Sequence, residues 1–545
     1  MKKYIIFAFS AALMVLALGI TSCTGDLDVT PIDPNLQTGD KINPDALLNK
    51  CYGVIALAGQ TGPNGDSDVD GIDGGTSGYY RQMWNSNELT TDEAICGWGD
   101  DGILEFDFNQ YDRTHPMLRG YYYRLYVSIA FCNQYLADFS EFDATKTAEV
   151  RFLRALSYYL LLDAYGNVPF VTSVSSEKPQ QIMRADLYNW LEEELLAIEP
   201  DLSEAKPKTS SDANYGRVDK AADWFLLMRL YLNAEVYTGT AQWAKAAEYA
   251  KKIMNSPYKL YTTEKNGYSA YAQLFMGDNG ENGSSVEAVF PILQDGLTTQ
   301  SWGTSLFLMA GSIDSNVHIF GSEKSGGNSS EGWGGNRTRP DLIAKFFPDV
   351  ENAPNVAAYL MPIIAGDDRA MFDGEGREVD GAQTAEEVKS DGHFKRGFAS
   401  CKWNGWKSDG SEGHGSQFLD TDVFLFRVAE AYLTFAEATA RLNGGTFNNE
   451  ALAAVNAVRA RANAEEKATF NLSELCDEWS REFYFEGIRR PTLIRFKRFG
   501  GDVNYNWTFK GGVKAGRNFN SNLNVFAIPE TDIIANGNLV QNPGY

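Results

Sequence analysis

The sequence predicts a mostly α-helical protein, in which antiparallel helix pairs form a scaffold and long irregular segments form a ligand-binding part. Apolar residues recur at helical spacing over many stretches, and short turns separate these stretches in pairs. Long tracts rich in glycine and aromatic residues lie between them. Loops of such length are usually functional or disordered, and their Trp, Tyr and Phe residues argue against disorder. We therefore expect an ordered, irregular subdomain that packs on the helices.

The helical pattern is found at residues 45–58, 121–139, 146–165, 186–198, 219–237, 242–254, 422–442, 449–464 and 472–499. Short turns divide some of these stretches into helix pairs, which resemble tetratricopeptide-like units, although the match to a period of about 34 residues is loose. We therefore predict a tetratricopeptide-like helical-hairpin scaffold at 41–260 and 421–499. The large irregular, loop-rich ligand-binding subdomain is assigned to 60–115, 261–420 and 500–545.

The N-terminus has the features of an export signal. Lys2 and Lys3 precede an apolar run, and small residues lead to Cys23. This order is typical of a secretory signal, and its end at a cysteine resembles a bacterial lipoprotein signal, in which Cys23 is acylated. We assign 1–22 to the signal peptide and 23–40 to a lipidated, flexible tether; an ordinary signal peptide is the alternative. An acyl chain anchors a protein to a membrane without spanning it.

Composition excludes several classes of function. The net charge of −24 argues against nucleic acid, because binding to phosphates needs a basic face. The five cysteines after Cys23 show no spacing typical of a disulfide framework or a zinc site. The four histidines show no metal-ligand spacing either. After the signal, no apolar run approaches the roughly 18 residues that a spanning helix needs.

A set of motifs carries a family resemblance across the chain. They lie, in order, at 149–169 (EVRFLRALSYYLLLDAYGNVP), 216–222, 427–438, 456–461, 481–489 and 541–545. Together these motifs resemble the SusD/RagB family. The resemblance implies a helical scaffold with an irregular ligand-binding subdomain. It also implies a non-enzymatic lipoprotein of the outer membrane, which faces the cell exterior, binds glycans and covers a SusC-like TonB-dependent transporter.

The resemblance extends to a starch-binding member of the family, which is similar over residues 68–71, 78–81, 87–93, 291–296 and 422–427. It implies an arc of aromatic side chains that stacks on maltooligosaccharide, with polar groups beside it. The matching positions in this chain are Asp73, Arg81, Trp98, Asp101, Trp302 and Trp333. Asp101 replaces an asparagine of that relative, Trp302 replaces a tyrosine, and Cys96 stands where the relative has a further tryptophan.

These residue types suit sugar binding. A pyranose ring has apolar C–H faces that an indole can cover, and Arg, Asp or Asn can bond to the hydroxyls at its edge. Three stacks that each bury about 100 Å² would contribute roughly 7 kcal/mol, against an association cost of at least about 4. We therefore expect weak binding, on the order of micromolar to millimolar. The alternative is that these tryptophans are core residues, as we expect for Trp190 and Trp224 on helical stretches.

A possible metal site lies in the second irregular tract. The segment 278–282 (DNGEN) resembles a calcium loop, with oxygen ligands at alternate positions. The resemblance implies Asp278, Asn282, Asp420 and Asp422 as ligands of a structural Ca²⁺, while Gly280 stands where the relative has an acidic side chain. The alternative is an ordinary acidic turn, and no cofactor is expected to be required.

Three functions remain in competition. The first is a surface protein that binds starch-type α-glucan, or another glycan, and works with the transporter and with other surface glycan-binding lipoproteins and amylases. The second is a surface glycoside hydrolase, which needs two carboxylates about 5 to 9.5 Å apart. With 72 acidic residues the sequence does not exclude such a pair. The third is a helical interaction protein without a sugar site. The family resemblance favours the first.

Overall fold

The computed structural model describes residues 43–65, 67–321, 324, 326–380 and 395–545. The chain divides into two units, Met1–Leu47 and Leu48–Tyr545, and apart from the start of helix α2 (Pro44–Ala56) every element described below lies in the second. The predicted signal peptide, the tether and Cys23 lie outside the described residues. Within the described part of the chain, every helix is too short or too polar to span a lipid bilayer.

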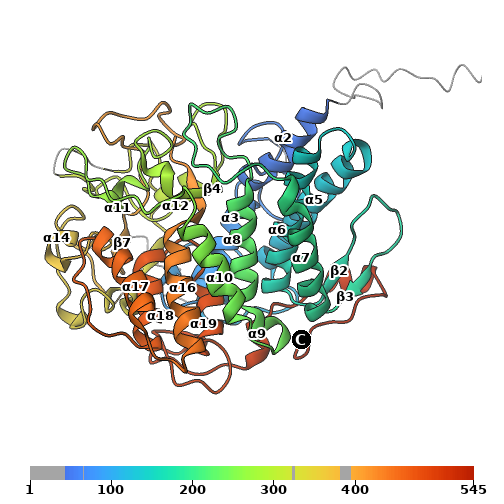
Figure 1. Cartoon of the computed structure of the whole chain (residues 1–545). Helices are drawn as coiled ribbons and strands as arrows, with labels where there is room; N and C mark the ends of the chain where they lie inside the picture. The colour runs from blue at the N-terminus through green and yellow to red at the C-terminus, as the bar shows by residue number, and fades with distance from the viewer. Residues whose placement is uncertain (1–42, 66, 322–323, 325, 381–394) are drawn as a thin grey trace, which may run out of the picture. The chain divides into compact units, whose positions relative to one another are not determined.

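The protein is mostly helical, as predicted (Figure 1). The long helices are α2 (Pro44–Ala56), α5 (Pro116–Phe139), α6 (Ala144–Ala164), α7 (Arg184–Ile198), α8 (Lys220–Leu232), α10 (Trp243–Met254), α16 (Ala429–Leu442), α17 (Asn449–Arg461) and α18 (Leu472–Phe483). The three predicted pairs pack together as α5 with α6, α8 with α10 and α16 with α17. Helix α10 also packs against α16, so that two pairs distant in sequence form one continuous block.

Side-chain caps fix where several of these helices begin. The side chain of Asp143 accepts a hydrogen bond from the Lys146 backbone N–H at the start of α6. Asp219 does the same for Ala221 and Ala222 at the start of α8. Such caps satisfy backbone N–H groups that have no partner within the helix. The acidic residues that precede the apolar stretches thus set the boundaries between helices.

Three predicted helices are wrong in extent. The stretch 472–499 is divided into α18 and α19 (Arg489–Arg495), because Phe485 and Gly487 between them have positive φ. The stretch 422–442 begins with strand β8 (Val423–Arg427) and becomes helical only afterwards. The stretch 219–237 breaks at Asn233, beyond which the short helix α9 (Ala234–Thr238) begins.

Short elements make up the irregular tracts and connect some of the long helices. The helices are α3 (Tyr79–Trp84), a π-helical turn η3 (Asn85–Leu89), α4 (Ile103–Asp107), α11 (Ala270–Gln273), α12 (Ser305–Ala310), α13 (Pro340–Ile343), α14 (Met361–Ala365) and α20 (Glu530–Ala535). The antiparallel strand pairs are β1 (Ala94–Cys96) with β5 (Asn336–Thr338), β2 (Val168–Phe170) with β3 (Gln180–Ile182), β4 (Ala288–Ile292) with β8, and β6 (Phe372–Asp373) with β7 (Ala399–Ser400). Because β4 and β8 are paired, the second irregular tract is hydrogen-bonded to the chain that leads into α16.

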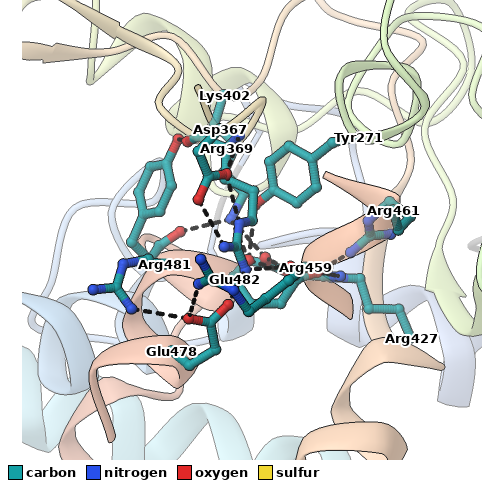
Figure 2. A network of polar contacts seen from close by, with 12 residues as sticks. Tyr271, Asp367, Arg369, Lys402, Arg427, Arg459, Arg461, Glu478, Arg481 and Glu482 are labelled. Atoms are coloured by element: carbon teal, nitrogen blue, oxygen red, sulfur yellow. Dashed lines mark hydrogen bonds and ion pairs between the residues drawn. The ribbon is translucent and has the colours of Figure 1, made fainter. Parts of the chain in front are cut away.

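A buried network of ionic side chains joins α18 to its surroundings, as Figure 2 shows. Glu478 and Glu482 extend from α18 and are fully buried. Glu482 bonds to Arg427 at 2.5 Å and also pairs with Arg461, while Glu478 bonds to Arg369 at 2.7 Å. Because Arg427 lies on β8 and Arg369 lies between α14 and β6, the network ties the helices to the irregular tract. No local sequence pattern indicates these buried charges.

Candidate functional site

Three tryptophans that are far apart in sequence line one cleft of about 600 Å³. Trp333 lies in the middle: its ring centroid is 6.2 Å from that of Trp98 and 6.0 Å from that of Trp302. The planes of these neighbouring rings are inclined by 57° and 42° respectively. All three side chains are half-buried, so that each keeps part of its surface exposed. The predicted arc of aromatic side chains is therefore present as a row of three inclined indoles.

A short strand pair brings two of the indoles together. Trp98 follows β1, Trp333 precedes β5, and Cys96 pairs with Asn336 across the two strands. The backbone N–H of Gly97 donates to the carbonyl of Gly335 at 3.0 Å and continues the pairing towards the cleft. In an antiparallel pair the end of one strand lies beside the start of the other. The pairing thus places Trp98 and Trp333 side by side although more than two hundred residues separate them.

Hydrogen bonds hold two of the indoles in orientation. The Nε1–H of Trp302 donates to Oδ1 of Asn64 at 3.2 Å, and the Nε1–H of Trp333 donates to Oε2 of Glu331 at 2.6 Å. Glu331 is itself held by Gln417, whose Nε2–H donates to its other carboxylate oxygen at 2.8 Å. A ring fixed at its edge can present its face to a ligand with little loss of rotamer freedom. These contacts therefore pre-organise the surface of the cleft.

Polar groups lie beside the row of indoles. Arg81 extends from α3, and its guanidinium lies 5.5 Å from the Trp98 ring centroid and 4.8 Å from that of Phe307. Burial lowers the pKa of Arg81, and the nearby Asp100 and Asp73 oppose that shift. Within the described residues the Arg81 Nε–H has no hydrogen-bond partner, while Nη1–H donates to the Gly75 carbonyl at 3.3 Å. The cleft is thus lined by a mostly buried cationic side chain, one of whose N–H groups has no protein acceptor among the described residues.

Asp73 lies on the loop before α3, where its Oδ1 accepts hydrogen bonds from the backbone N–H and the hydroxyl of Thr76, at 3.1 and 3.3 Å. The carboxylate is held on the wall of the cleft and stays exposed. Its second oxygen can accept a hydrogen bond from a ligand hydroxyl. Apolar ring faces beside a guanidinium and a carboxylate are the groups that cover a pyranose ring and bond to its edge.

The structure places five of the six predicted glycan-binding residues on this cleft: Asp73, Arg81, Trp98, Trp302 and Trp333. Asp101 is exposed and does not line the cleft, whereas its neighbour Asp100 does. Cys96 is fully buried in β1 and contributes no stacking surface. The sequence analysis also missed Asn64, which lies in a Pro63-Asn64-Gly65 turn on the rim. That turn signal could have located the loop, although not its contact with Trp302.

Three of the four predicted calcium ligands, Asp278, Asp420 and Asp422, line a pocket of about 230 Å³, and the fourth, Asn282, donates to Asp278 at 3.2 Å. Protein donors reach each of these carboxylates, but Oδ1 of Asp420 is buried without a hydrogen-bond partner among the described residues. Asp278 accepts hydrogen bonds from the backbone and hydroxyl of Ser408 and from the side chain of Asn282, and Asp422 accepts the Tyr215 hydroxyl at 2.6 Å. Burial raises the pKa of Asp422 to about 7.

No group of three or more His, Cys, Asp or Glu side chains is placed to hold a metal ion within the described ranges. As arranged, these side chains form a hydrogen-bonded junction, whereas a calcium ion takes a shell of six to eight oxygens. Calcium at this site stays an untested prediction.

Comparison with known proteins decides the family. The chain is 38% identical to the starch-binding protein SusD of Bacteroides thetaiotaomicron, over 100% of this chain and 99% of the relative. The chain belongs to the SusD family. The family model for SusD proteins matches residues 365–545.

Solved structures of other SusD-like proteins share the fold of this family member. One is a SusD superfamily protein from Parabacteroides distasonis, with a TM-score of 0.65 and 19% identity, which covers 93% of this chain and 100% of its own. Another is a laminarin-binding SusD-like protein, with a TM-score of 0.63, 19% identity and the same coverage. The family and the mostly helical fold expected from the sequence motifs are therefore confirmed.

Proposed function

We propose that this SusD-family chain is a non-catalytic protein of the cell surface that captures starch-type α-glucan by aromatic stacking. The observation that carries the proposal is the row of three indoles, Trp98, Trp333 and Trp302, beside Arg81 and Asp73 on one cleft. Starch binding by the SusD relative supports the choice of glycan, because that protein is similar over its whole length.

The inclination of the rings favours a curved ligand. Each indole plane is turned by 42° or 57° from the next, so that the three faces do not lie in one plane. An α-1,4-linked glucan coils, and successive glucose units can follow such a surface. A flat β-1,4-linked chain would contact one or two rings and lose the remaining stacking area. We therefore expect α-glucans to bind more tightly than cellulose-type chains.

The proposal includes a place in the cell. Acylation at Cys23 would anchor the protein to the outer membrane, and the body would face the exterior and deliver maltooligosaccharides to a SusC-like TonB-dependent transporter. The support is the lipoprotein-type signal in the sequence and membership of the SusD family. Weak binding suits this role, because a ligand that must pass to a transporter has to dissociate readily.

The first experiment is affinity electrophoresis of the chain from Thr24 onward in gels that contain amylopectin, pullulan, dextran or inulin. We expect amylopectin and pullulan to retard the protein. The Trp98→Ala and Trp302→Ala variants should each bind about tenfold more weakly or worse, since each loses one stacking face. Trp243→Ala is the matched control, because Trp243 is also half-buried but begins α10, outside the cleft.

Absence of retardation by amylopectin would overturn the starch assignment, and retardation by another polymer would redirect it to that glycan. The competing hydrolase function is tested in the same samples. We expect no increase in reducing sugar on incubation with starch, because the proposed role is binding alone. A steady release of reducing ends, lost on substitution of Asp73 or Asp100, would establish a hydrolase instead.

A further inference from the structure

A second pocket, of about 420 Å³, shares no lining residue with the indole cleft. Two of its walls are aromatic. The ring centroids of Tyr268 and Phe320 are 4.7 Å apart, with planes inclined by 78°, and Tyr359 lines the pocket just before α14. Tyr359 is 37% exposed, and Ile363, on α14, is 75% exposed. In Figure 1, α14 and α11 lie near each other at the same side of the molecule.

Several polar atoms at the rim of this pocket can form further hydrogen bonds. Oδ2 of Asp368 accepts a hydrogen bond from the Asn463 side chain at 2.8 Å, which fixes the carboxylate in place. The Asp368 backbone N–H donates to the Ala462 carbonyl at 2.9 Å and holds the residue on its other side. Oδ1 of Asp368 and the phenol oxygens of Tyr268 and Tyr359 have no hydrogen-bond partner among the described residues. A ligand with several hydroxyl groups could satisfy these atoms.

We propose that this pocket is a second carbohydrate site, which takes one or two hexose units by stacking on its tyrosines and by hydrogen bonding to Asp368. The inference rests on the proposed glycan-binding function and deepens it. Both sites combine aromatic faces with a carboxylate that accepts a hydrogen bond from a neighbouring side chain. In the cleft the donor is the Thr76 hydroxyl, and in the second pocket it is the Asn463 amide. An ordinary apolar pocket would not need a positioned carboxylate at its rim.

A second site would matter most for long chains. When one polysaccharide occupies both sites, the second contact forms at the high effective concentration set by the first, and overall affinity rises by more than either site gives alone. With fewer stacking faces than the indole cleft, the second site alone should bind on the order of millimolar. Short oligosaccharides would not benefit, because they fill one site at a time.

The experiment separates the two sites by substitution. Tyr359→Ala removes an exposed wall of the second pocket. Ile364→Ala is the matched control, because Ile364 is 52% exposed on α14, the helix that follows Tyr359, and does not line the pocket. We expect Tyr359→Ala to weaken retardation by amylopectin about tenfold. Its binding of maltotriose at the indole cleft, measured by tryptophan fluorescence, should stay unchanged, and Ile364→Ala should change neither measurement.

The second site is then measured alone. The Trp98→Ala/Trp302→Ala double variant removes two stacking faces of the indole cleft. Saturation-transfer NMR of this variant with maltotriose should still show a weak signal. Adding Tyr359→Ala should abolish the signal, and adding Ile364→Ala should leave it unchanged. Absence of that residual signal, or no effect of Tyr359→Ala on amylopectin binding, would overturn the second site. If the wild type binds no α-glucan, the proposed function fails first. The same NMR test with methyl glycosides of glucose, galactose and mannose then decides the second site separately.

Discussion

Trp98 fits its position only because two glycines leave room for its indole. A Cβ atom added at Gly335 would lie 2.1 Å from Cε2 of Trp98, far inside van der Waals contact, and one at Gly311 would lie 3.2 Å from its Cη2. The indole also packs against the buried Phe307, at 6.3 Å between centroids. The stacking face of this residue is therefore set by the absence of side chains around it.

Substitution Gly335→Ala should displace the Trp98 indole from the cleft. We expect glycan affinity to fall about tenfold or more, as it would on loss of one stacking face, with little change in the far-UV circular dichroism. Gly99→Ala is the control, because a Cβ at Gly99 meets no atom within 4 Å. Unchanged affinity of Gly335→Ala for amylopectin, measured beside that control, would show that this ring does not contact the ligand.

At the scale of elements, the break between α18 and α19 shows tertiary contacts overriding a helical pattern. The backbone N–H of Gly487 donates to Oε1 of the buried Glu88 at 2.6 Å, and the carbonyl of Phe485 accepts the Trp84 indole N–H at 2.8 Å. Gly487 has φ of 80°, in the left-handed region that glycine tolerates. The break turns Glu486 towards Arg427, which its two carboxylate oxygens contact at 2.7 Å.

Gly487→Ala should destabilise the protein through this break. A left-handed conformation costs a non-glycine residue about 1 to 2 kcal/mol, and the new Cβ would also lie 2.9 Å from Cε of Met83. Gly444→Ala separates the two effects, because Gly444 has φ of 64° but open space around its Cβ position. Chemical denaturation should show a larger loss for Gly487→Ala, and equal losses would mean that Met83 moves aside freely.

At the scale of the whole molecule, buried ion pairs connect the helical block to the irregular tracts. Burial alone would raise the pKa of Glu478 and Glu482, but the surrounding guanidinium groups outweigh it and lower both to about 2. The dominant guanidinium groups are those of Arg369 for Glu478 and Arg461 for Glu482. Buried pairs of this kind specify a particular arrangement, since removal of one partner leaves a charge without compensation.

These carboxylates predict acid sensitivity. Their pKa values in the folded state are lower than in the unfolded chain, so the stability they contribute is fully present above about pH 4.5 and is lost as the pH falls towards 2. Glu482→Gln should reduce the free energy of unfolding by about 3 to 5 kcal/mol at neutral pH and flatten its acid dependence.

Glu450→Gln is the control for that substitution, because its pair with Lys251 is 3.4 Å long and largely exposed. It should change stability by less than about 1 kcal/mol. Denaturation midpoints between pH 2 and 7 provide the measurement. A Glu482→Gln curve parallel to that of the wild type below pH 4.5 would contradict the role assigned to this carboxylate.

The sequence by itself determined the helix pairs, the family and part of the cleft. Periodic apolar residues and capping side chains such as Asp143 are local signals that can be read from the sequence. Specific motifs such as 149–169 indicate the family. Five residues of the cleft followed from the same resemblance. Local patterns could not show that 423–427 is a strand, because a short apolar run fits either element until β4 pairs with it.

Only the tertiary structure decided how the three indoles are inclined. It also decided that Asp100, and not Asp101, lines the cleft, and that Asn64 accepts the hydrogen bond of the Trp302 indole. Each depends on which distant segments approach one another. That approach follows from strand pairing and from buried charges such as Glu482, whose partners no sequence spacing reveals.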